Sequence, residues 1–338
     1  MKSTNVLLFL ALIYVLHVGK AIFLPFVMAL FLWVLIWLLE SSFKGLVART
    51  KAPAALGLIA RPLSILFIGG IAWAVMAVIV SNLAEASHSF AKYQPNLESI
   101  VARFNAWAGT SFNIDKILGE VDLKKLANSV LAEGAGLIRG IVMVIIYLAF
   151  LLLEEKSMYK KLPLVFKGKK AFDKAMVEKI LSKIRTYLFI KTGSGILTAV
   201  LAYAVMKHVG LDFALFWAML MFAFNYMPTI GSAVASIPPI VLAVLQFDGQ
   251  IAPIAIVAGG ITAIQVGLGN FLEPRILGAS VGISPLALIF SLVIWGWIWG
   301  FAGMFLCVPI MIIALIVLYN IPSTKKVAIL LSQDGENI

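Results

Sequence analysis

Charged residues are scarce in this sequence, and the scarcity indicates its class. Asp, Glu, Lys and Arg make up 13% of the 338 residues, whereas 62% are hydrophobic and the mean hydropathy is +1.02. A soluble domain carries about a quarter charged residues. Residues 285–319 contain no Asp, Glu, Lys, Arg or His, and several apolar runs exceed the roughly 18 residues that predict a spanning helix. We therefore expect an all-α polytopic integral membrane protein.

Cysteine and histidine are almost missing as well. The sequence has a single cysteine, Cys307, so a disulfide within one chain is excluded. This cysteine lies in an apolar run. The three histidines are scattered, without the spacing of metal ligands. The sequence also lacks a Walker loop, a dinucleotide-binding turn and a nucleophile elbow. We expect neither an enzyme nor a cofactor, and the sequence offers no metal site.

The apolar runs predict about eight transmembrane helices. Their expected ranges are 5–18, 21–39, 63–82, 135–153, 188–206, 213–226, 251–271 and part of 285–319. The first run is short for a full span, so it is expected to be tilted or partly interfacial. We expect a multi-pass protein of the cytoplasmic (inner) cell membrane.

The basic residues lie in the segments between these runs and predict the orientation. The formal net charge is +11, but Lys and Arg concentrate in loops as the positive-inside rule describes, which argues against a nucleic-acid partner. Residues 154–191 carry the strongest signal, with eleven Lys and Arg against four acids. Eight spans place both termini in the cytoplasm, whereas a further crossing at 225–246 would move the C-terminus outside.

These patterns divide the chain into six expected regions. They are an N-terminal three-span region (1–82), an extracytoplasmic cap of amphipathic helices (83–134), a fourth span (135–153), a basic cytoplasmic loop with an amphipathic helix (154–187), a C-terminal transport core (188–320) and a cytoplasmic tail (321–338). Asp212 and Asp248 fall in short turns of the core, where we expect them to be solvated.

The cap is predicted from two helical patterns of apolar residues. They are Ile100, Phe104 and Trp107, then Leu123, Leu126 and Val130. Packing of these helices on one another or on the bilayer surface is the preferred interpretation. A cap for ligand entry or partner docking is the alternative.

Two apolar segments of the core are too irregular or too long for plain spanning helices. Residues 225–246 contain three prolines, and proline inside a helix frees a backbone group that is costly in lipid. We expect a broken or re-entrant segment there, with a kinked but complete helix as the alternative. Residues 285–319 as one helix would measure about 50 Å against a bilayer core of about 30 Å. This second run must break, fold back or project.

Glu273 and Arg275 form a charge pair beside Pro274 at an expected helix break. Glutamate before proline suits an N-cap, where the helix end and Arg275 would both favour the carboxylate. The pair is either a structural ion pair or a proton or cation site, and Asn270 one turn earlier fits both. Transporters build their sites from discontinuous helices, so the candidate pathway residues come from two broken segments of the core, 225–246 and 270–309. They are Asn225, Pro228, Thr229, Gly231, Ser232, Asn270, Glu273, Pro274, Arg275, Gly278, Pro285, Gly296, Gly300, Gly303 and Pro309.

Two alternatives concern packing. The Gly296-x-x-x-Gly300 spacing favours close helix approach over a binding role. Trp295, Trp297 and Trp299 could wall a pocket, but packing is the preferred interpretation.

The segments FNYMPTIGSAVASIPPIVLAVL (224–245) and NFLEPRILGASVGISPLALIF (270–290) resemble the signature of the autoinducer-2 exporter (AI-2E) family of permeases. The LLLEE sequence after the fourth span is also similar, and the resemblance extends over nearly the whole chain. It implies a cytoplasmic-membrane transporter of about eight spans with an intramembrane hairpin, assembled as a homo-oligomer. Asn225 stands where an acidic residue is common in the family, which argues against cation antiport through that position. Ser284 stands where a histidine often precedes the proline.

Three functions follow as hypotheses. The first is gradient-driven export of a small polar solute, such as a quorum-sensing signal. The second is monovalent cation (sodium)/proton antiport that uses Glu273. The third is a non-transporting membrane scaffold. The expected partners are the lipid bilayer, a small-molecule or ion substrate, and further copies of the chain.

Overall fold

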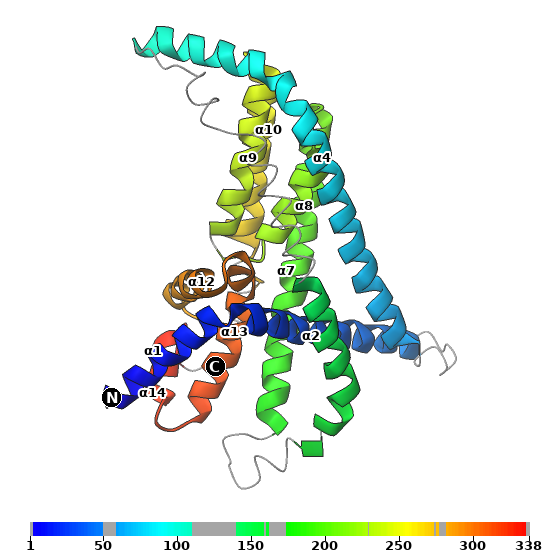
Figure 1. The fold of residues 1–338 in the computed structure, drawn as a ribbon, viewed down its shortest axis with the longest axis vertical. Helices are drawn as coiled ribbons and strands as arrows, with labels where there is room; N and C mark the ends of the chain where they lie inside the picture. The colour runs from blue at the N-terminus through cyan, green and yellow to red at the C-terminus, as the bar shows by residue number, and fades with distance from the viewer. Residues whose placement is uncertain are drawn as a thin grey trace. The chain divides into compact units, whose positions relative to one another are not determined.

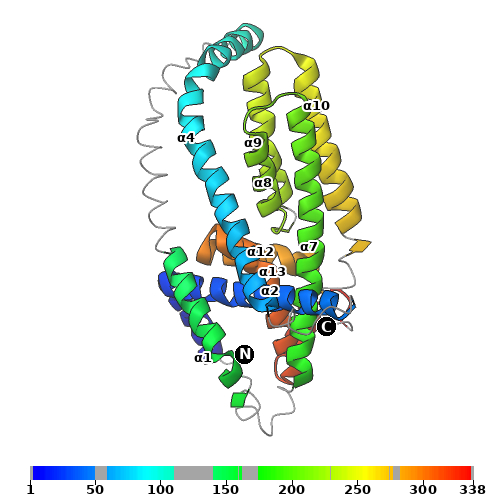
Figure 2. The same ribbon diagram turned by 90° about the vertical axis from the view of Figure 1, so that its right-hand side faces the viewer.

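The computed structural model describes residues 3–49, 59–109, 140–158, 160–161, 174–228, 230–273, 275–276 and 282–335. Helices make up most of these residues (Figures 1 and 2). The β-type pairing among them is one isolated antiparallel bridge between Ile283 and Ser332. The predicted all-α class is confirmed.

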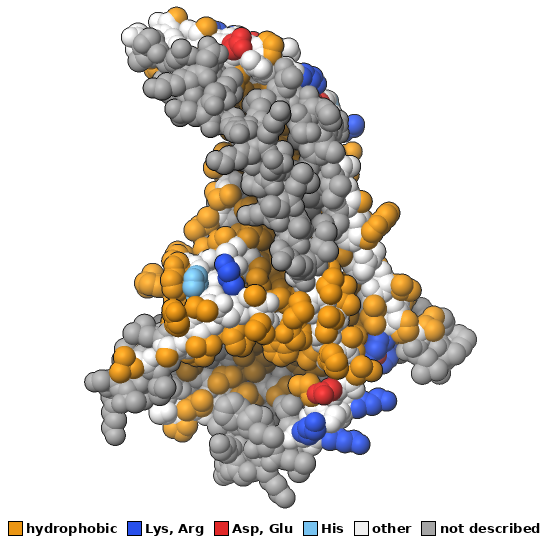
Figure 3. Space-filling view, viewed as in Figure 1, with side chains coloured by type: hydrophobic (Ala, Val, Ile, Leu, Met, Phe, Trp, Pro, Cys, Tyr) orange, Lys and Arg blue, Asp and Glu red, His pale blue; other side chains and the backbone are white. Residues whose placement is uncertain are grey.

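Within the described residues, five helices are long and apolar enough to cross a membrane. Their apolar parts are Lys20–Gly45, Ala175–His208, Ile230–Phe247, Ile251–Leu272 and Phe301–Asn320. Shorter apolar helices occupy Ala60–Val75, Ala214–Phe224 and Pro285–Trp299. Large apolar side chains cover much of the described surface in Figure 3, and Trp73 and Phe189 are 75% and 82% exposed. Such surfaces suit lipid, so the polytopic class is confirmed, while the number of eight spans stays a prediction.

The chain divides into two units. One comprises Met1–Ile71, Ile138–Ile190 and Ile276–Ile338, and the other Ala72–Leu137 and Lys191–Arg275. We call them the terminal unit and the central unit.

The N-terminal helices are longer than the sequence predicted. α1 (Ser3–Val18) and α2 (Lys20–Arg49) meet at Gly19. α4 (Ala60–Ala108) is one helix of 49 residues, so the expected boundary between a third span and a cap, at residue 82, lies inside it. Phe104 and Trp107 of the first cap pattern lie exposed near its end. The second cap pattern lies outside the described residues.

The fourth and fifth predicted spans also extend into neighbouring regions. Residues 140–158 are helical, and residues 135–139 lie outside the described part. α7 (Lys174–His208) joins the predicted amphipathic helix and the fifth span in one helix of 35 residues. Met176 and Ile184, in the part predicted to be an amphipathic helix, are buried.

The central unit is built on a hairpin and two further helical segments. α8 (Ala214–Phe224) and α9 (Ile230–Phe247) form the hairpin, followed by α10 (Ile251–Ile264) and the π-helix η1 (Gln265–Leu272). Figures 1 and 2 both show α8, α9 and α10 beside α7. Their buried core includes Met206, Met221, Ala243, Val257 and Ile261.

The break predicted in 225–246 is confined to its first residues. α8 ends at Phe224, a turn follows at Asn225–Pro228, and α9 then continues through Pro238 and Pro239. The segment is thus broken, as expected, at its first residues, and it is one continuous helix from Ile230 to Phe247. A Cβ on Gly231 would lie 2.0 Å from the Phe224 carbonyl oxygen, so only glycine allows this tight reversal. Whether the hairpin is re-entrant stays a prediction.

The terminal unit contains the second predicted break. α12 (Pro285–Trp299) and α13 (Phe301–Asn320) form a hairpin that reverses at Gly300, whose φ of 65° and ψ of −142° favour glycine. α14 (Lys325–Leu331) follows. Ser284 caps α12 by accepting a hydrogen bond from the Ala287 amide, with Pro285 at the first helical position. The prediction that 285–319 must break is confirmed.

A charge cluster ties three helices of the terminal unit together. Arg61 at the start of α4 donates to Glu40 of α2 at 2.7 Å and to Glu155 of the 140–158 helix at 3.1 Å. Lys44 also donates to Glu40, at 2.7 Å. Both carboxylates are buried and therefore poorly hydrated. The positive charge of Arg61 compensates their negative charges.

Candidate functional site

Four polar side chains meet in the interior of the central unit, and we call them the Lys191–Glu273 cluster. Lys191 Nζ donates to Glu273 Oε2 at 2.6 Å, and Ser194 Oγ donates to Glu273 Oε1 at 2.6 Å. Asn225 Nδ2 lies 3.1 Å from both Glu273 Oε1 and Ser194 Oγ. Lys191 Nζ also donates to the Asn225 backbone carbonyl at 2.8 Å. Glu273 thus accepts three hydrogen bonds.

Three different helix segments supply these residues. Lys191 and Ser194 lie about one turn apart on α7, so they present their side chains on the same face. Asn225 follows the last residue of α8 and Glu273 follows the last residue of η1. Carbonyl oxygens at a helix end have no partner in the helix and carry partial negative charge. The ammonium of Lys191 satisfies one of them at Asn225.

The close approach of α7 and α8 depends on a glycine. A Cβ on Gly195 would lie 3.0 Å from the Phe222 ring and 3.3 Å from Asn225 Nδ2. The absence of a side chain therefore lets Asn225 reach Ser194 and Glu273. Beside the cluster, Thr192 Oγ1 and the Tyr226 hydroxyl are 2.7 Å apart, a second bond between α7 and the α8–α9 turn.

The ion pair is almost removed from solvent. The side chains of Lys191 and Glu273 are 7% and 10% exposed. Burying two charges costs several kcal/mol per ion, roughly balanced by their attraction and by further hydrogen bonds. The bonds from Ser194 and Asn225 supply that addition, so removing any single member leaves another polar group uncompensated.

The predicted environment of Glu273 was wrong. The sequence suggested an N-cap paired with Arg275, but Glu273 has helical φ and ψ of −58° and −49° at the end of η1. Its cationic partner is Lys191, 82 positions away in the chain, and Arg275 is exposed. Pro274, the expected first residue of a new helix, lies outside the described residues.

The other predicted site residues are divided between the two units, and some lie outside the described residues. Pro228 and Gly231 shape the α8–α9 turn, and the Ser232 carbonyl accepts from Gln265 at 3.4 Å. Asn270 is exposed on η1. Thr229 and Gly278 lie outside the described residues. The remaining candidates belong to the terminal unit, namely Pro285, Gly296, Gly300, Gly303 and Pro309.

In the terminal unit these residues serve the α12–α13 hairpin. Gly296 lies against Met304, and a Cβ on Gly303 would lie 1.9 Å from the Trp295 carbonyl oxygen. Pro309 is buried inside α13. The packing interpretation of Gly296 is therefore confirmed, while Gly300 provides the reversal.

The tryptophans also take packing positions. The Trp299 indole donates to the Leu16 carbonyl at 3.1 Å, and Trp297 stacks on His17. Both contacts join α1 to the α12–α13 hairpin. They bear out packing for these two residues.

Sequence reasoning missed Lys191 and Ser194. A signal was present, because Lys191 lies among apolar residues within the predicted fifth span. A lysine inside a membrane helix is expensive and normally has a partner or a function. Its partner could not be read from the sequence, since the contact joins two distant segments.

Asp212 and Asp248 were also misjudged as solvated turn residues. Asp212 Oδ2 accepts from Lys92 Nζ at 2.8 Å and from the Tyr93 hydroxyl at 2.6 Å. Partial burial acts to raise the pKa of Asp212, but these two bonds and the Lys92 charge outweigh it and hold the pKa below the ordinary value of 3.8. Asp248 accepts from Ser99 at 2.9 Å and from Arg103. These hydrogen bonds thus hold α4 against the α7–α8 turn at Asp212 and the α9–α10 turn at Asp248.

The donor set limits the chemistry of the cluster. Among the described residues, no group of three or more His, Cys, Asp or Glu could hold a metal ion. The cluster offers one carboxylate, one ammonium, one hydroxyl and one amide. Such a set can bind a polar solute. The Glu273 carboxylate can also pair with another cation in place of the Lys191 ammonium. Neither event requires covalent chemistry.

Comparison with known proteins points to one family. A sequence model described as AI-2E family transporter matches residues 6–323. The chain is 30% identical to the AI-2 transport protein TqsA of Escherichia coli (strain K12) over 322 residues, which cover 92% of this chain and 89% of that protein. It is 27% identical over 281 residues to the same organism's "Putative transport protein YhhT", with 80% of each chain covered.

Proposed function

Because the chain belongs to the AI-2E family of transporters, we propose that it is a multi-pass permease of the cytoplasmic membrane. It exports a small polar solute, and an ion gradient drives the export. The observation that carries the proposal is the buried Lys191–Glu273 ion pair with its two neutral donors. Charged residues inside membrane helices commonly mark solute or ion pathways. TqsA carries AI-2 transport in its name, so autoinducer-2 is the first solute to test.

The cluster has the properties of a site that a solute can open. Lys191 and Glu273 satisfy one another in the closed arrangement, so the pair can stay buried without a ligand. A polar solute with both a donor and an acceptor can replace that bond with one bond to each partner. Ser194 and Asn225 would then hold the Glu273 carboxylate in place during the exchange.

The surrounding helices also fit this role. Glu273 follows a π-helix, a form found frequently at functional sites. Asn225 lies where the α8–α9 hairpin reverses, and α8 at 11 residues is about 16 Å long, half a bilayer core. Interrupted helices that meet near the membrane midplane are the usual site architecture of secondary transporters.

Transport from proteoliposomes tests the proposal. Vesicles containing the protein are loaded with labelled solutes, autoinducer-2 among them, and efflux is measured with and without a proton or sodium gradient. We expect gradient-dependent efflux of at least one polar solute. The double variant Lys191→Gln/Glu273→Gln should lose it, because the pair becomes neutral while both amides can still bond.

The matched control is Lys207→Gln/Glu154→Gln, which makes the same charge change at two exposed positions. It should transport as the unaltered protein does. If the cluster variant folds normally and transports at the control rate, the cluster is structural and the proposed site is wrong. If no solute moves but sodium leaves in exchange for protons, cation antiport replaces export as the function.

A further inference from the structure

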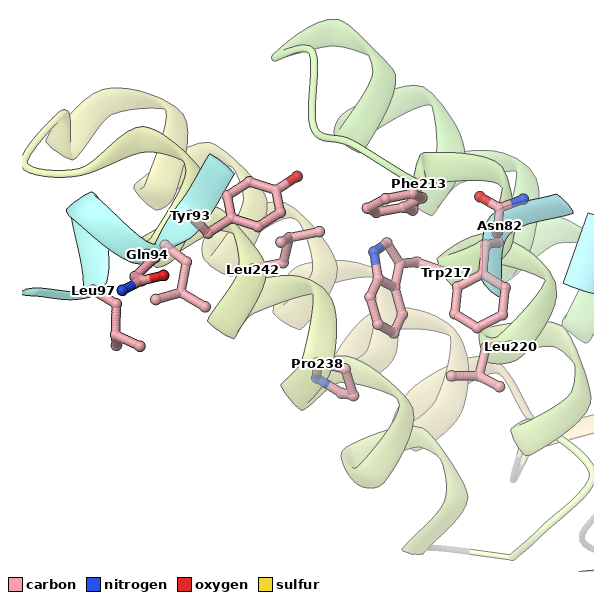
Figure 4. Close-up of a pocket in the computed structure, with 11 residues that line it drawn as sticks. Asn82, Tyr93, Gln94, Leu97, Phe213, Trp217, Leu220, Pro238 and Leu242 are labelled. Carbon is pink, nitrogen blue, oxygen red and sulfur yellow. The ribbon is translucent and has the colours of Figure 1, made fainter. Parts of the chain in front are cut away.

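An apolar cavity of about 480 Å³ lies in the central unit, away from the residues of the Lys191–Glu273 cluster. α4, α8 and α9 form its walls, and the lining includes Tyr93, Leu97, Trp217, Pro238 and Leu242 (Figure 4). Its size falls in the range of about 300–1,000 Å³ that is typical of ligand pockets. We propose that this cavity binds the acyl chain of a membrane phospholipid.

The chemistry of the lining favours a plain hydrocarbon chain. The Tyr93 hydroxyl is already bonded to Asp212. The indole nitrogen of Trp217 is buried and has no hydrogen-bond partner among the described residues, so it does not reach the surface of the cavity. Figure 4 shows Phe213, Trp217 and Leu242 as the apolar surfaces that remain. A cavity of this kind holds water poorly and binds apolar groups.

A lysine lies next to one of the lining residues and is paired with Asp212. Lys92 Nζ is 5.6 Å from the centre of the Tyr93 ring, which lines the cavity, and the Lys92 side chain is 62% exposed. Lysine has three donors, and its bond to Asp212 uses one of them. An aliphatic chain therefore matches the cavity, and the two remaining donors of Lys92 can bind an anionic head group beside the Asp212 carboxylate.

A phospholipid is favoured over a free fatty acid by the setting of the cavity. The helices that form two of its walls present apolar side chains outward, including Leu215 on α8 and Ile237 and Val241 on α9, which are 47%, 59% and 51% exposed. Surfaces of this composition face lipid in a membrane protein. Bilayer phospholipid is thus in great excess beside the cavity.

α4 holds the cavity closed on one side. Asn96 Nδ2 donates to the Leu245 carbonyl at 2.9 Å, and Ser99 donates to Asp248. Together with the Lys92 and Tyr93 bonds to Asp212, these contacts fix α4 against the α7–α8 and α9–α10 turns. The wall formed by Tyr93 and Leu97 is therefore held by hydrogen bonds as well as by apolar packing.

The test is photolabelling in vesicles of phosphatidylethanolamine and phosphatidylglycerol. One preparation contains a phospholipid with a diazirine in its acyl chain, and the other contains the free fatty acid with the same group. Labelled peptides are mapped by mass spectrometry. In the unaltered protein we expect phospholipid label concentrated on the cavity residues of α4, α8 and α9. Equal label on the outward residues Ile237 and Val241 would overturn the proposal.

Two variants and a control sharpen the result. Leu97→Trp fills the cavity and should lower its phospholipid label at least fivefold, whereas Leu215→Trp on the outer face of α8 should not change it. Lys92→Gln should lower it by up to about fivefold, the upper end of the range for an exposed ion pair. Stronger labelling of the cavity by the fatty acid than by the phospholipid would indicate an apolar cargo instead and overturn the assignment. The peptide map of the unaltered protein decides the question if a variant fails to fold.

Discussion

Lys191 Nζ lies 2.6 Å from Glu273 Oε2, in a bond that connects the middle of α7 to the end of η1. Both side chains are buried, and both have a second contact to Asn225. The arrangement joins Lys191, the lysine that interrupts the predicted fifth span, to Glu273, the carboxylate that precedes Pro274. The surroundings of Glu273 are therefore set by a contact between two segments that are distant in the sequence.

Replacing Lys191 with methionine should destabilise the protein strongly. The Glu273 carboxylate would stay buried without a cation, which costs about 3–5 kcal/mol. Thermal unfolding in detergent measures the loss. Lys207→Met, at an exposed position of the same helix, is the control and should unfold like the unaltered protein. Addition of Glu273→Gln to Lys191→Met should restore much of the stability, and no restoration would contradict the pairing argument.

Gly231→Ala should destabilise the α8–α9 hairpin by about 1–3 kcal/mol, the usual cost of overpacking. The new Cβ would meet the Phe224 carbonyl oxygen at 2.0 Å, so the turn would have to open. Gly259→Ala in α10 meets nothing within 4 Å and is the matched control. Alanine there should be neutral or stabilising. Equal unfolding temperatures for the two variants would show that the reversal does not need glycine.

Arg61→Met should destabilise the terminal unit. Glu40 and Glu155 would both stay buried without their shared guanidinium, and only Glu40 would keep Lys44. A loss of about 1–3 kcal/mol is expected, because the carboxylates are buried but the Arg61 side chain is 36% exposed, and thermal unfolding measures it. Arg185→Met removes an exposed arginine and serves as the control. A loss no larger than that of the control would mean that the charge cluster adds no stability.

Asp212 should contribute to loss of stability in acid. Its pKa in the folded protein is below the ordinary 3.8, so its contribution is complete above that value and is lost as the pH falls through the folded pKa. Asp212→Asn should therefore unfold at a lower temperature than the unaltered protein at neutral pH, and the difference should narrow below about pH 4. Glu154→Gln, at an exposed position, controls for loss of a carboxylate. A constant difference at all pH values would contradict the assignment.

The elements that the sequence predicted well depend on local chemistry. Long apolar runs form helices in lipid because the backbone must satisfy its own hydrogen bonds. The run from Pro285 had to break because it exceeds the bilayer thickness, and Gly300 provides the reversal. Ser284 and Pro285 begin α12 for reasons that lie within four residues of sequence.

Helix lengths were harder to predict from local patterns. A change from apolar to amphipathic composition suggested boundaries at residues 82 and 187, yet α4 and α7 continue through both. Composition changes where the surroundings of a helix change, but the backbone hydrogen bonds can continue across that point. Pro238 and Pro239 likewise remain inside α9.

The sequence by itself determined the membrane class and, through the resemblance of its C-terminal segments, the family, and it predicted a break in each of two core segments. The class and the breaks follow from hydropathy, run length and proline chemistry, which act over short stretches of the chain. Only the tertiary structure decided that Glu273 pairs with Lys191 and not with Arg275, and that Asp212 and Asp248 hold α4. Such partners are chosen by which helices pack together, because a buried charge takes the opposite charge nearest in space, wherever that residue lies in the chain.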